Sequence, residues 1–215
     1  MAFAPSPRPA PRPRTSPRSG ARQAPGEVRL IGGLWKRSKL PVLDAPGLRP
    51  TPDRLRETLF NWLGQDLAGL RCLDAFAGTG ALGLEAASRG AAEVLLLERD
   101  ARLAQALRTT CERLGAAGVR VQVADALRWM AAQSAGVAFD VVFVDPPFDR
   151  GLWGVALDAA RPLLAVDGRL YLEADRAFEA AELGERGYAL LRHARAGQVH
   201  GMLLAPAAAP ADALP

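Results

Sequence analysis

The feature that most constrains this fold is a regular alternation of short apolar runs with amphipathic segments between residues 71 and 173. The apolar runs have the length of buried strands, and the segments between them have the spacing of helices. Strands that alternate with helices form a parallel sheet covered by helices on both faces. We therefore predict an α/β fold. The predicted strands span residues 71–74, 93–98, 119–123, 140–145 and 169–173, and the predicted helices span residues 81–89, 101–114, 126–132 and 152–164.

The C-terminal part of the sheet follows a different pattern. Two strand-like segments, at 188–194 and 198–204, are separated by Arg195-Ala196-Gly197, which predicts a hairpin. An antiparallel strand often closes an otherwise parallel sheet. We therefore predict a mostly parallel, seven-stranded sheet that ends in an antiparallel hairpin strand.

A short extension precedes this core. Residues 28–34 and 39–43 predict a two-stranded β-ribbon. Thr51 is a suitable N-cap, and Pro52 suits the first position of a helix. Together they predict a helix whose apolar face continues to Leu63.

The composition limits what surrounds the core. The chain has 215 residues, enough for one domain with extensions. Its net charge of +4 owes much to residues 1–25, which hold five arginines, seven prolines and no acidic residue. Such a segment cannot offset its ordering entropy by burial, so we expect a disordered tail, either simply solvated or a loose tether to a polyanion. No apolar run reaches the ~20 residues that span a bilayer, and two cysteines are too few for a disulfide framework, which favours a cytoplasmic protein.

A glycine-rich loop follows the first core strand and opens the next helix. Gly78, Gly80 and Gly83 spell G-x-G-x-x-G, and Glu98 ends the next strand. Taken alone, this pattern is typical of a dinucleotide site in which the acidic residue binds a ribose diol. A nicotinamide-dependent oxidoreductase is therefore one hypothesis.

The acidic residues around this loop favour another ligand. Asp74 ends the strand before the loop, where it would repel a pyrophosphate and attract a cation. S-adenosylmethionine has an ammonium and a sulfonium group, a ribose diol for Glu98, and an adenine amine for Asp125. Asp125 is equally well explained as the N-cap of the next helix. The predicted cofactor residues in this region are Asp74, Phe76, Gly78, Gly80, Glu98, Asp125 and Ala126.

The most specific chemical motif is Asp145-Pro146-Pro147-Phe148, which ends an apolar run. The two prolines fix the backbone and remove two amide donors. Acceptors on both N–H bonds of a nucleobase amine, from Asp145 and the Pro146 carbonyl, would aim its lone pair at a methyl donor. Phe148 would stack on the extruded base. We therefore predict Asp145, Pro146 and Phe148 as catalytic residues and Pro147 as a substrate contact, against the alternative of a merely stiffened turn.

A basic stretch before the core is a candidate surface for RNA. It can bind phosphates and stack on a base, or form a solvated ribbon with Trp35 as a core contact. The core leaves no room for a large recognition domain, which favours structured RNA as a substrate. His193 and His200 lack partners at metal-ligand spacing, so we predict no metal site. The predicted RNA contacts in this stretch are Arg29, Trp35, Lys36, Arg37, Lys39 and Arg49.

Four blocks of the sequence carry a resemblance in combination. They are Arg29-Leu30-Ile31-Gly32-Gly33-Leu34-Trp35, the stretch from Gly47 to Trp62, Asp74-Ala75-Phe76-Ala77-Gly78-Thr79-Gly80, and Phe143-Val144-Asp145-Pro146-Pro147-Phe148. The chain resembles the bacterial 16S rRNA (guanine(966)-N2)-methyltransferase family over residues 27 to about 204.

This resemblance implies a Rossmann-like methyltransferase fold, S-adenosylmethionine as methyl donor, and a guanine N2 amine of 16S ribosomal RNA as acceptor. It also implies that Arg49 and Thr51 line the cofactor or base pocket. The substrate is then either naked RNA or an assembling small-subunit particle, and we expect a monomer with no membrane partner.

The same interpretation divides the chain into four segments. We expect a disordered basic tail at 1–26, an RNA-facing ribbon and helix at 27–60, a methyltransferase core at 61–204 and a frayed end at 205–215. Three other functions stay open. They are adenine-N6 or other exocyclic-amine methylation, the nicotinamide-dependent oxidoreductase, and an RNA-binding assembly factor without catalysis.

Overall fold

The computed structural model describes residues 27–43, 51–133, 136–148 and 151–207. The strands are β1 (Glu27–Arg29), β2 (Lys39–Pro41), β3 (Arg71–Asp74), β4 (Glu93–Glu98), β5 (Val119–Val123), β6 (Phe139–Val144), β7 (Leu164–Ala174), β8 (Tyr188–Ala196) and β9 (Val199–Pro206). The helices are α1 (Asp53–Leu63), α2 (Ala81–Ser88), α3 (Ala101–Leu114), α4 (Ala126–Ala131), α5 (Trp153–Ala160) and α6 (Ala180–Glu185), with a 3-10 turn at Arg161–Leu163.

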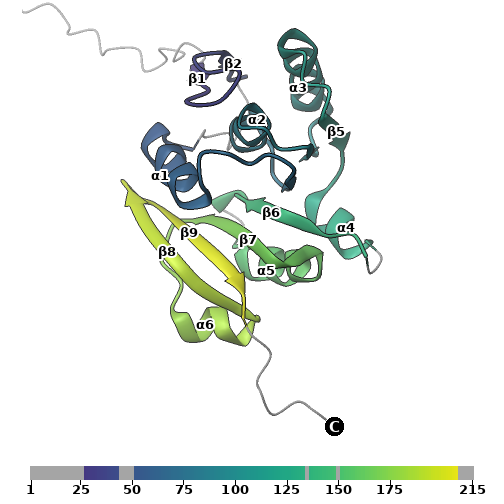
Figure 1. Ribbon diagram of the computed structural model, residues 1–215. Coiled ribbons are helices and arrows are strands. Elements are labelled where there is room, and N and C mark those ends of the chain that lie inside the picture. The colour runs from purple at the N-terminus through teal and green to yellow at the C-terminus, as the bar shows by residue number, and fades with distance from the viewer. Residues whose placement is uncertain (1–26, 44–50, 134–135, 149–150, 208–215) are drawn as a thin grey trace, which may run out of the picture.

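The main sheet has seven strands in the order β5-β4-β3-β6-β7-β9-β8 (Figure 1). The five strands from β5 to β7 are parallel, and β9 pairs antiparallel with both β7 and β8. The predicted α/β fold with an antiparallel C-terminal hairpin is therefore confirmed. Because strand order reverses at β3 and β6, the carboxyl ends of these two strands form the crevice where ligands bind in such folds.

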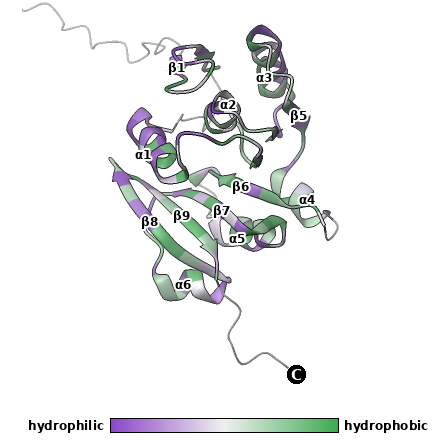
Figure 2. Ribbon diagram, viewed as in Figure 1, coloured by the Kyte–Doolittle hydropathy of each residue, from purple (hydrophilic) through white to green (hydrophobic). Residues whose placement is uncertain are grey.

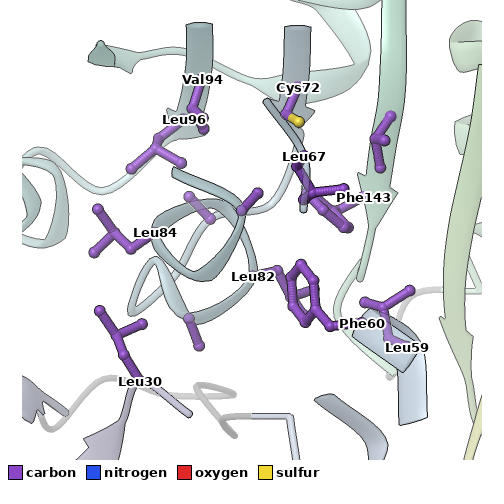
Figure 3. Packing of buried hydrophobic residues seen from close by; sticks show 14 of the residues in the cluster. Leu30, Leu59, Phe60, Leu67, Cys72, Leu82, Leu84, Val94, Leu96 and Phe143 are labelled. Carbon is purple, nitrogen blue, oxygen red and sulfur yellow. The ribbon is translucent and has the colours of Figure 1, made fainter. Parts of the chain in front are cut away.

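Helices cover both faces of the sheet with apolar side chains. On one face, Leu82 and Leu84 of α2 pack toward β3 and β4, and Phe60 of α1 lies 6.2 Å from Phe143 of β6, measured between ring centroids (Figure 3). On the other face, Leu157 of α5 belongs to a second buried cluster with β6 and β7. Figure 2 shows hydrophobic residues along the inner strands β6 and β9, whereas hydrophilic residues lie on the outer side of α1.

The ribbon of β1 and β2 is held by the C-terminal end of α2. The amides of Leu34 and Trp35 donate to the carbonyl and the hydroxyl of Ser88 at 2.7 and 2.9 Å. Gly33 has a φ of +71°, and a Cβ there would lie 1.9 Å from the Ser88 carbonyl oxygen. This close approach requires glycine, and it attaches the ribbon to the end of α2 that is remote from the glycine loop.

Several predicted boundaries are wrong. The strand predicted at 169–173 begins at Leu164, and the preceding helix ends at Ala160. Helix α6 was not predicted, because its six residues are too few to show a helical period. The ribbon strands have three residues each, shorter than predicted, because the chain turns at Gly33 to contact α2.

Two predicted turns are also displaced. The hairpin residues Ala196 and Val199 pair with each other, so the turn consists of Gly197 and Gln198, and Gly197 has a φ of +63°. The N-cap of α1 is Pro52 and makes no side-chain cap hydrogen bond. In the described part of the chain, no helix has the length and apolar character that crossing a bilayer requires.

Candidate active site

The site begins with Asp74 at the carboxyl end of β3. Its side chain is buried, and its Oδ2 accepts a 2.9 Å hydrogen bond from the amide of Gly83 on α2. Burial raises the pKa of Asp74 to about 7, although amide donors from Gly83 and Phe76 lower it; the charge of Glu98 raises it further. Asp74 is therefore a buried carboxyl that would gain from a cationic neighbour.

The glycine loop between β3 and α2 is built by backbone conformations that favour glycine. Gly78 and Gly80 have φ values of +51° and +76°, and Gly80 is the N-cap of α2. The amide of Gly78 donates to Oε2 of Glu98 at 3.0 Å, and the amide of Asp100 donates to Oε1 at 2.8 Å. The loop, Asp74 and Glu98 are thus brought together as the sequence predicts.

Asp145 follows the last residue of β6, next to this loop. Its pKa is raised well above the usual value, first by burial and then by the charges of Glu173 and Asp74. Pro146 is buried, and Phe148 is half-buried with its ring centroid 6.0 Å from that of Trp153 on α5. The turn therefore holds its carboxylate among other carboxylates and next to an aromatic wall.

Glu173 of β7 is a site residue that the sequence analysis did not identify. It is buried, and its Oε1 accepts a 3.0 Å hydrogen bond from the Tyr171 hydroxyl. Burial raises the pKa of Glu173 to about 7, while hydrogen bonds from Thr51 and Tyr171 and the charge of Arg56 lower it. An acidic residue near the end of the fifth parallel strand was the signal that could have found it.

Thr51 belongs to this site because its hydroxyl contacts the carboxyl of Glu173. The predicted cap role is wrong for a physical reason, since its hydroxyl bonds the Glu173 carboxyl instead of an amide in the first turn of α1. Thr51 is buried, in contrast to an ordinary exposed helix start. Arg49 lies outside the described residues.

The residues predicted to hold an adenine lie at the carboxyl end of β5. Asp125 is the N-cap of α4, and its Oδ1 accepts a 3.1 Å hydrogen bond from the amide of Arg128. Ala126 is buried beside it, and Phe76 is half-buried against the same apolar cluster as Ala126. The capping interpretation of Asp125 is therefore confirmed, and its exposed carboxylate keeps free acceptor capacity.

The ribbon residues predicted to contact RNA belong to a different part of the fold from the Asp145 turn. Trp35 is half-buried against the apolar core, and its neighbours Lys36 and Arg37 are exposed close to Ser88, at the far end of α2. Lys39 forms an exposed ion pair with Glu27, with 2.9 Å between Nζ and Oε2. The side chain of Arg29 is exposed, and the Arg29 carbonyl accepts a hydrogen bond from Arg56.

The chemistry of this donor set fits a cationic ligand better than a dinucleotide. The charges of Glu173 and Asp74 raise the pKa of Asp145, and the charge of Asp74 also raises the pKa of Glu173. None of these three carboxyls belongs to an ion pair within the described residues. A pyrophosphate would add charge of the same sign, whereas an ammonium or sulfonium group would be attracted. The geometry therefore argues against the oxidoreductase hypothesis.

Comparisons with known proteins agree with this geometry. Residues 28–205 match the model of a family described as conserved hypothetical protein 95. The chain is 46% identical over 152 residues to ribosomal RNA small subunit methyltransferase D of Escherichia coli K12, and this match covers 70% of this chain and 76% of that protein. It is 41% identical over 157 residues to the protein of the same name from Haemophilus influenzae, covering 71% and 81%.

A solved structure shows the same fold. It is the Escherichia coli protein yhhF, to which its description assigns a methyltransferase activity provisionally. The TM-score is 0.72 at 39% sequence identity, and the match covers 85% of this chain and 99% of that one. The predicted Rossmann-like methyltransferase fold is confirmed by this likeness.

Proposed function

The chain belongs to the family described as conserved hypothetical protein 95, and from this premise we propose that it methylates the N2 amine of a guanine in small-subunit ribosomal RNA with S-adenosylmethionine. Relatives at 46% and 41% identity are named ribosomal RNA small subunit methyltransferases, which supports the reaction and the RNA class. The observation that carries the proposal is the position of Asp145, at the end of β6 and within electrostatic reach of Asp74 beside the glycine loop.

The cofactor residues follow from the charges of the donor set. Asp74 would bind the ammonium group, Glu98 the ribose diol, and the exposed Asp125 the adenine amine. The free amides at the N-terminus of α2 and the glycines of the loop allow a close approach to the backbone. When bound, the cofactor would supply the methyl group from its sulfonium, and the rest of the cofactor would leave as a neutral thioether.

Asp145 and Pro146 orient the amine that receives the methyl group. The amine's lone pair is delocalised into the base, so acceptors on both N–H bonds are needed to aim it. The Asp145 carboxylate and the Pro146 carbonyl are these acceptors, and no amide donor of Pro146 or Pro147 competes with them. As the N–C bond forms and the S–C bond breaks, the amine loses one proton, which Asp145 can accept because its pKa is raised.

The exposed basic residues of the ribbon would contact the phosphate backbone away from the reacting base. Arg29, Lys36 and Arg37 are the candidates, because the amine of Lys39 is paired with Glu27. Trp35 packs against the core, which makes stacking on a base less favourable for it than for Phe148. The substrate would thus be held at two places, the ribbon by charge and the turn by shape.

Nucleoside mass spectrometry of small-subunit ribosomal RNA tests this proposal. RNA from cells without the gene should lack one N2-methylguanosine, and wild-type protein should restore it while Asp145→Ala should not. Loss of a methyladenosine instead would replace the guanine assignment by an adenine-N6 activity. If Asp145→Ala restores the nucleoside, the proposed role of the turn is wrong.

A further inference from the structure

The strongest observation that the proposed reaction does not use is the location of Glu173. Val144 of β6 pairs in register with Leu172 of β7, so the residues that follow them, Asp145 and Glu173, stand side by side on one face of the sheet. Neighbouring strands lie about 4.8 Å apart. A group bound between Asp145 and the Pro146 carbonyl is therefore also next to Glu173.

The Glu173 side chain is held firmly in this position. The Trp153 indole donates to the Glu173 carbonyl at 3.1 Å, which ties α5 to the end of β7. The Tyr171 hydroxyl donates to Oε1 at 3.0 Å, and the Thr51 hydroxyl is a second donor. An ionised carboxylate accepts up to about four hydrogen bonds, so these two hydroxyls leave acceptor capacity for a donor from a substrate.

A purely structural role explains this carboxylate poorly. Within the described residues, Glu173 has no ion-pair partner. The charge of Arg56 lowers its pKa, but Glu173 also lies among the like charges of Asp145 and Asp74, and its pKa stays raised. A buried carboxyl is costly unless hydrogen bonds and opposite charge compensate it, and sites that retain such a group are often functional. The remaining compensation would come from a substrate that presents hydrogen-bond donors.

Guanine presents these donors in the order that this pair of carboxylates requires. Its Watson–Crick edge carries the N2 amine and, next to it, the N1–H, which are both donors. Adenine has an unprotonated acceptor nitrogen at N1, which would face a carboxylate oxygen with no hydrogen between them. Bases extruded into such pockets are read through this edge.

We propose that Glu173 accepts the N1–H of the target guanine and so selects guanine over bases whose N1 is an acceptor. This inference rests on the proposed function, because it takes the amine at Asp145 to be guanine N2. It makes Glu173 a specificity-determining residue, whereas Asp145 serves the transfer to the amine. No covalent step is added to the reaction.

The test compares guanine with 2-aminopurine at the target position of a synthetic small-subunit rRNA fragment. The fragment is used either as naked RNA or assembled into a small-subunit particle, whichever form the wild-type protein methylates. 2-Aminopurine keeps the exocyclic amine but has an acceptor at N1. Sites that bind a substrate N–H reject an analogue without it by about 10⁴-fold, so wild type should discriminate by a factor of this order in kcat/KM. Glu173→Gln should reduce that factor to about tenfold or less, since a carboxamide can accept from one base or donate to the other.

Tyr171→Phe is the matched control. It removes the hydroxyl donor to Glu173 but keeps the carboxylate, so it should lower the rates on both bases alike and leave their ratio near the wild-type value. If Glu173→Gln also lowers both rates in proportion, Glu173 is structural and the proposal is wrong. The melting temperatures of both variants show whether either has a folding defect. If Glu173→Gln has one, Glu173→Asp, which keeps the negative charge, is tested in its place. Glu173→Asp must preserve the preference for guanine, and its loss would also contradict the proposal. Methylation of adenine but not guanine by wild type would instead refute the proposed function.

Discussion

The amide of Gly83 donates a 2.9 Å hydrogen bond to Oδ2 of Asp74. The same glycine is needed for packing, because a Cβ at this position would lie 2.2 Å from Cδ2 of Leu96 and 3.1 Å from Asp74 Oδ2. Helix α2 can therefore approach β3 and β4 closely enough to hold the carboxylate only if residue 83 has no side chain. The third glycine of the loop, Gly83, therefore holds the Asp74 carboxylate in place and is not needed to contact a phosphate.

Gly83→Ala should weaken both folding and cofactor binding. Overpacking of this kind costs typically about 1–3 kcal/mol, and the displaced helix should move the Gly83 amide away from Asp74. Urea unfolding and calorimetric titration with S-adenosylmethionine measure the two effects. Gly184→Ala is the control, since a Cβ there meets nothing within 4 Å and alanine favours the helix α6. Equal stability of both variants would contradict this account.

The raised pKa of Asp74 predicts how stability depends on pH. The folded state keeps the proton up to about pH 7, whereas the unfolded state releases it near its ordinary pKa of about 3.9. The folded state thus binds more protons in this window, so this contribution is full below about pH 4 and is lost as pH rises through about 7. Its size is on the order of 4 kcal/mol. Urea unfolding of wild type and Asp74→Asn between pH 5 and about 8 should show a shallower decline in the variant; parallel curves would contradict the shift.

Cofactor binding should have the opposite pH dependence. A cationic ligand prefers the ionised form of Asp74, so the affinity for S-adenosylmethionine should rise as pH increases through about 7. Binding at pH 6 should release protons, which calorimetry in buffers of different ionisation enthalpy detects. Asp74→Asn should bind more weakly and release fewer protons. An affinity that is constant from about pH 6 to 8 would mean that the ammonium group does not contact Asp74.

The sheet was predictable because its signals are local. Strands β3, β4 and β5 have the predicted bounds, since Asp74 and Glu98 end the first two apolar runs and Asp125 follows the third. The start of β7 was missed because Asp167 and Gly168 look like a turn, whereas strand pairing with β6 extends from Leu164 and crosses a register shift. Tertiary pairing, which no short window contains, decided this boundary.

The candidate site was predictable only where one motif contains it. The glycine loop and the Asp145 turn each lie in a continuous block, and both are at the crevice. Glu173 and Thr51 are far apart in the chain, and each looks ordinary in its own neighbourhood. Their contact exists because α1 begins beside the end of β7, a relationship that depends on how α1 packs over β8 and β9.

The attachment of the ribbon predicts a large effect of Glu85→Gln. Glu85 is buried, and its Oε1 lies 2.8 Å from Arg89 Nη2, while its Oε2 accepts a 2.8 Å hydrogen bond from the amide of Ile31. Removing its charge leaves Arg89, and Arg56 at 3.9 Å, with less compensation. Breaking a buried ion pair costs about 3–5 kcal/mol.

Urea unfolding measures this loss of stability. Glu27→Gln is the matched control, because its ion pair with Lys39 is exposed, and exposed pairs contribute about 0–1 kcal/mol. If the two substitutions cost the same, the cluster around Glu85 is not what holds the ribbon to α2.

The final prediction separates chemistry from binding at Asp145. Asp145→Asn keeps the shape but replaces one acceptor oxygen by a donor, so it should lower methyl transfer about 10²–10³-fold and change S-adenosylmethionine binding far less. Asp140→Asn is the control on the same strand, because Asp140 lies at the opposite end of β6, where its Oδ2 accepts a 2.8 Å hydrogen bond from the amide of Arg71. Single-turnover assays at saturating cofactor should therefore show a large loss for Asp145→Asn and a small one for Asp140→Asn. If Asp145→Asn lost cofactor affinity in proportion to rate, the carboxylate would serve binding, and the transfer would depend on the Pro146 carbonyl and the aromatic wall alone.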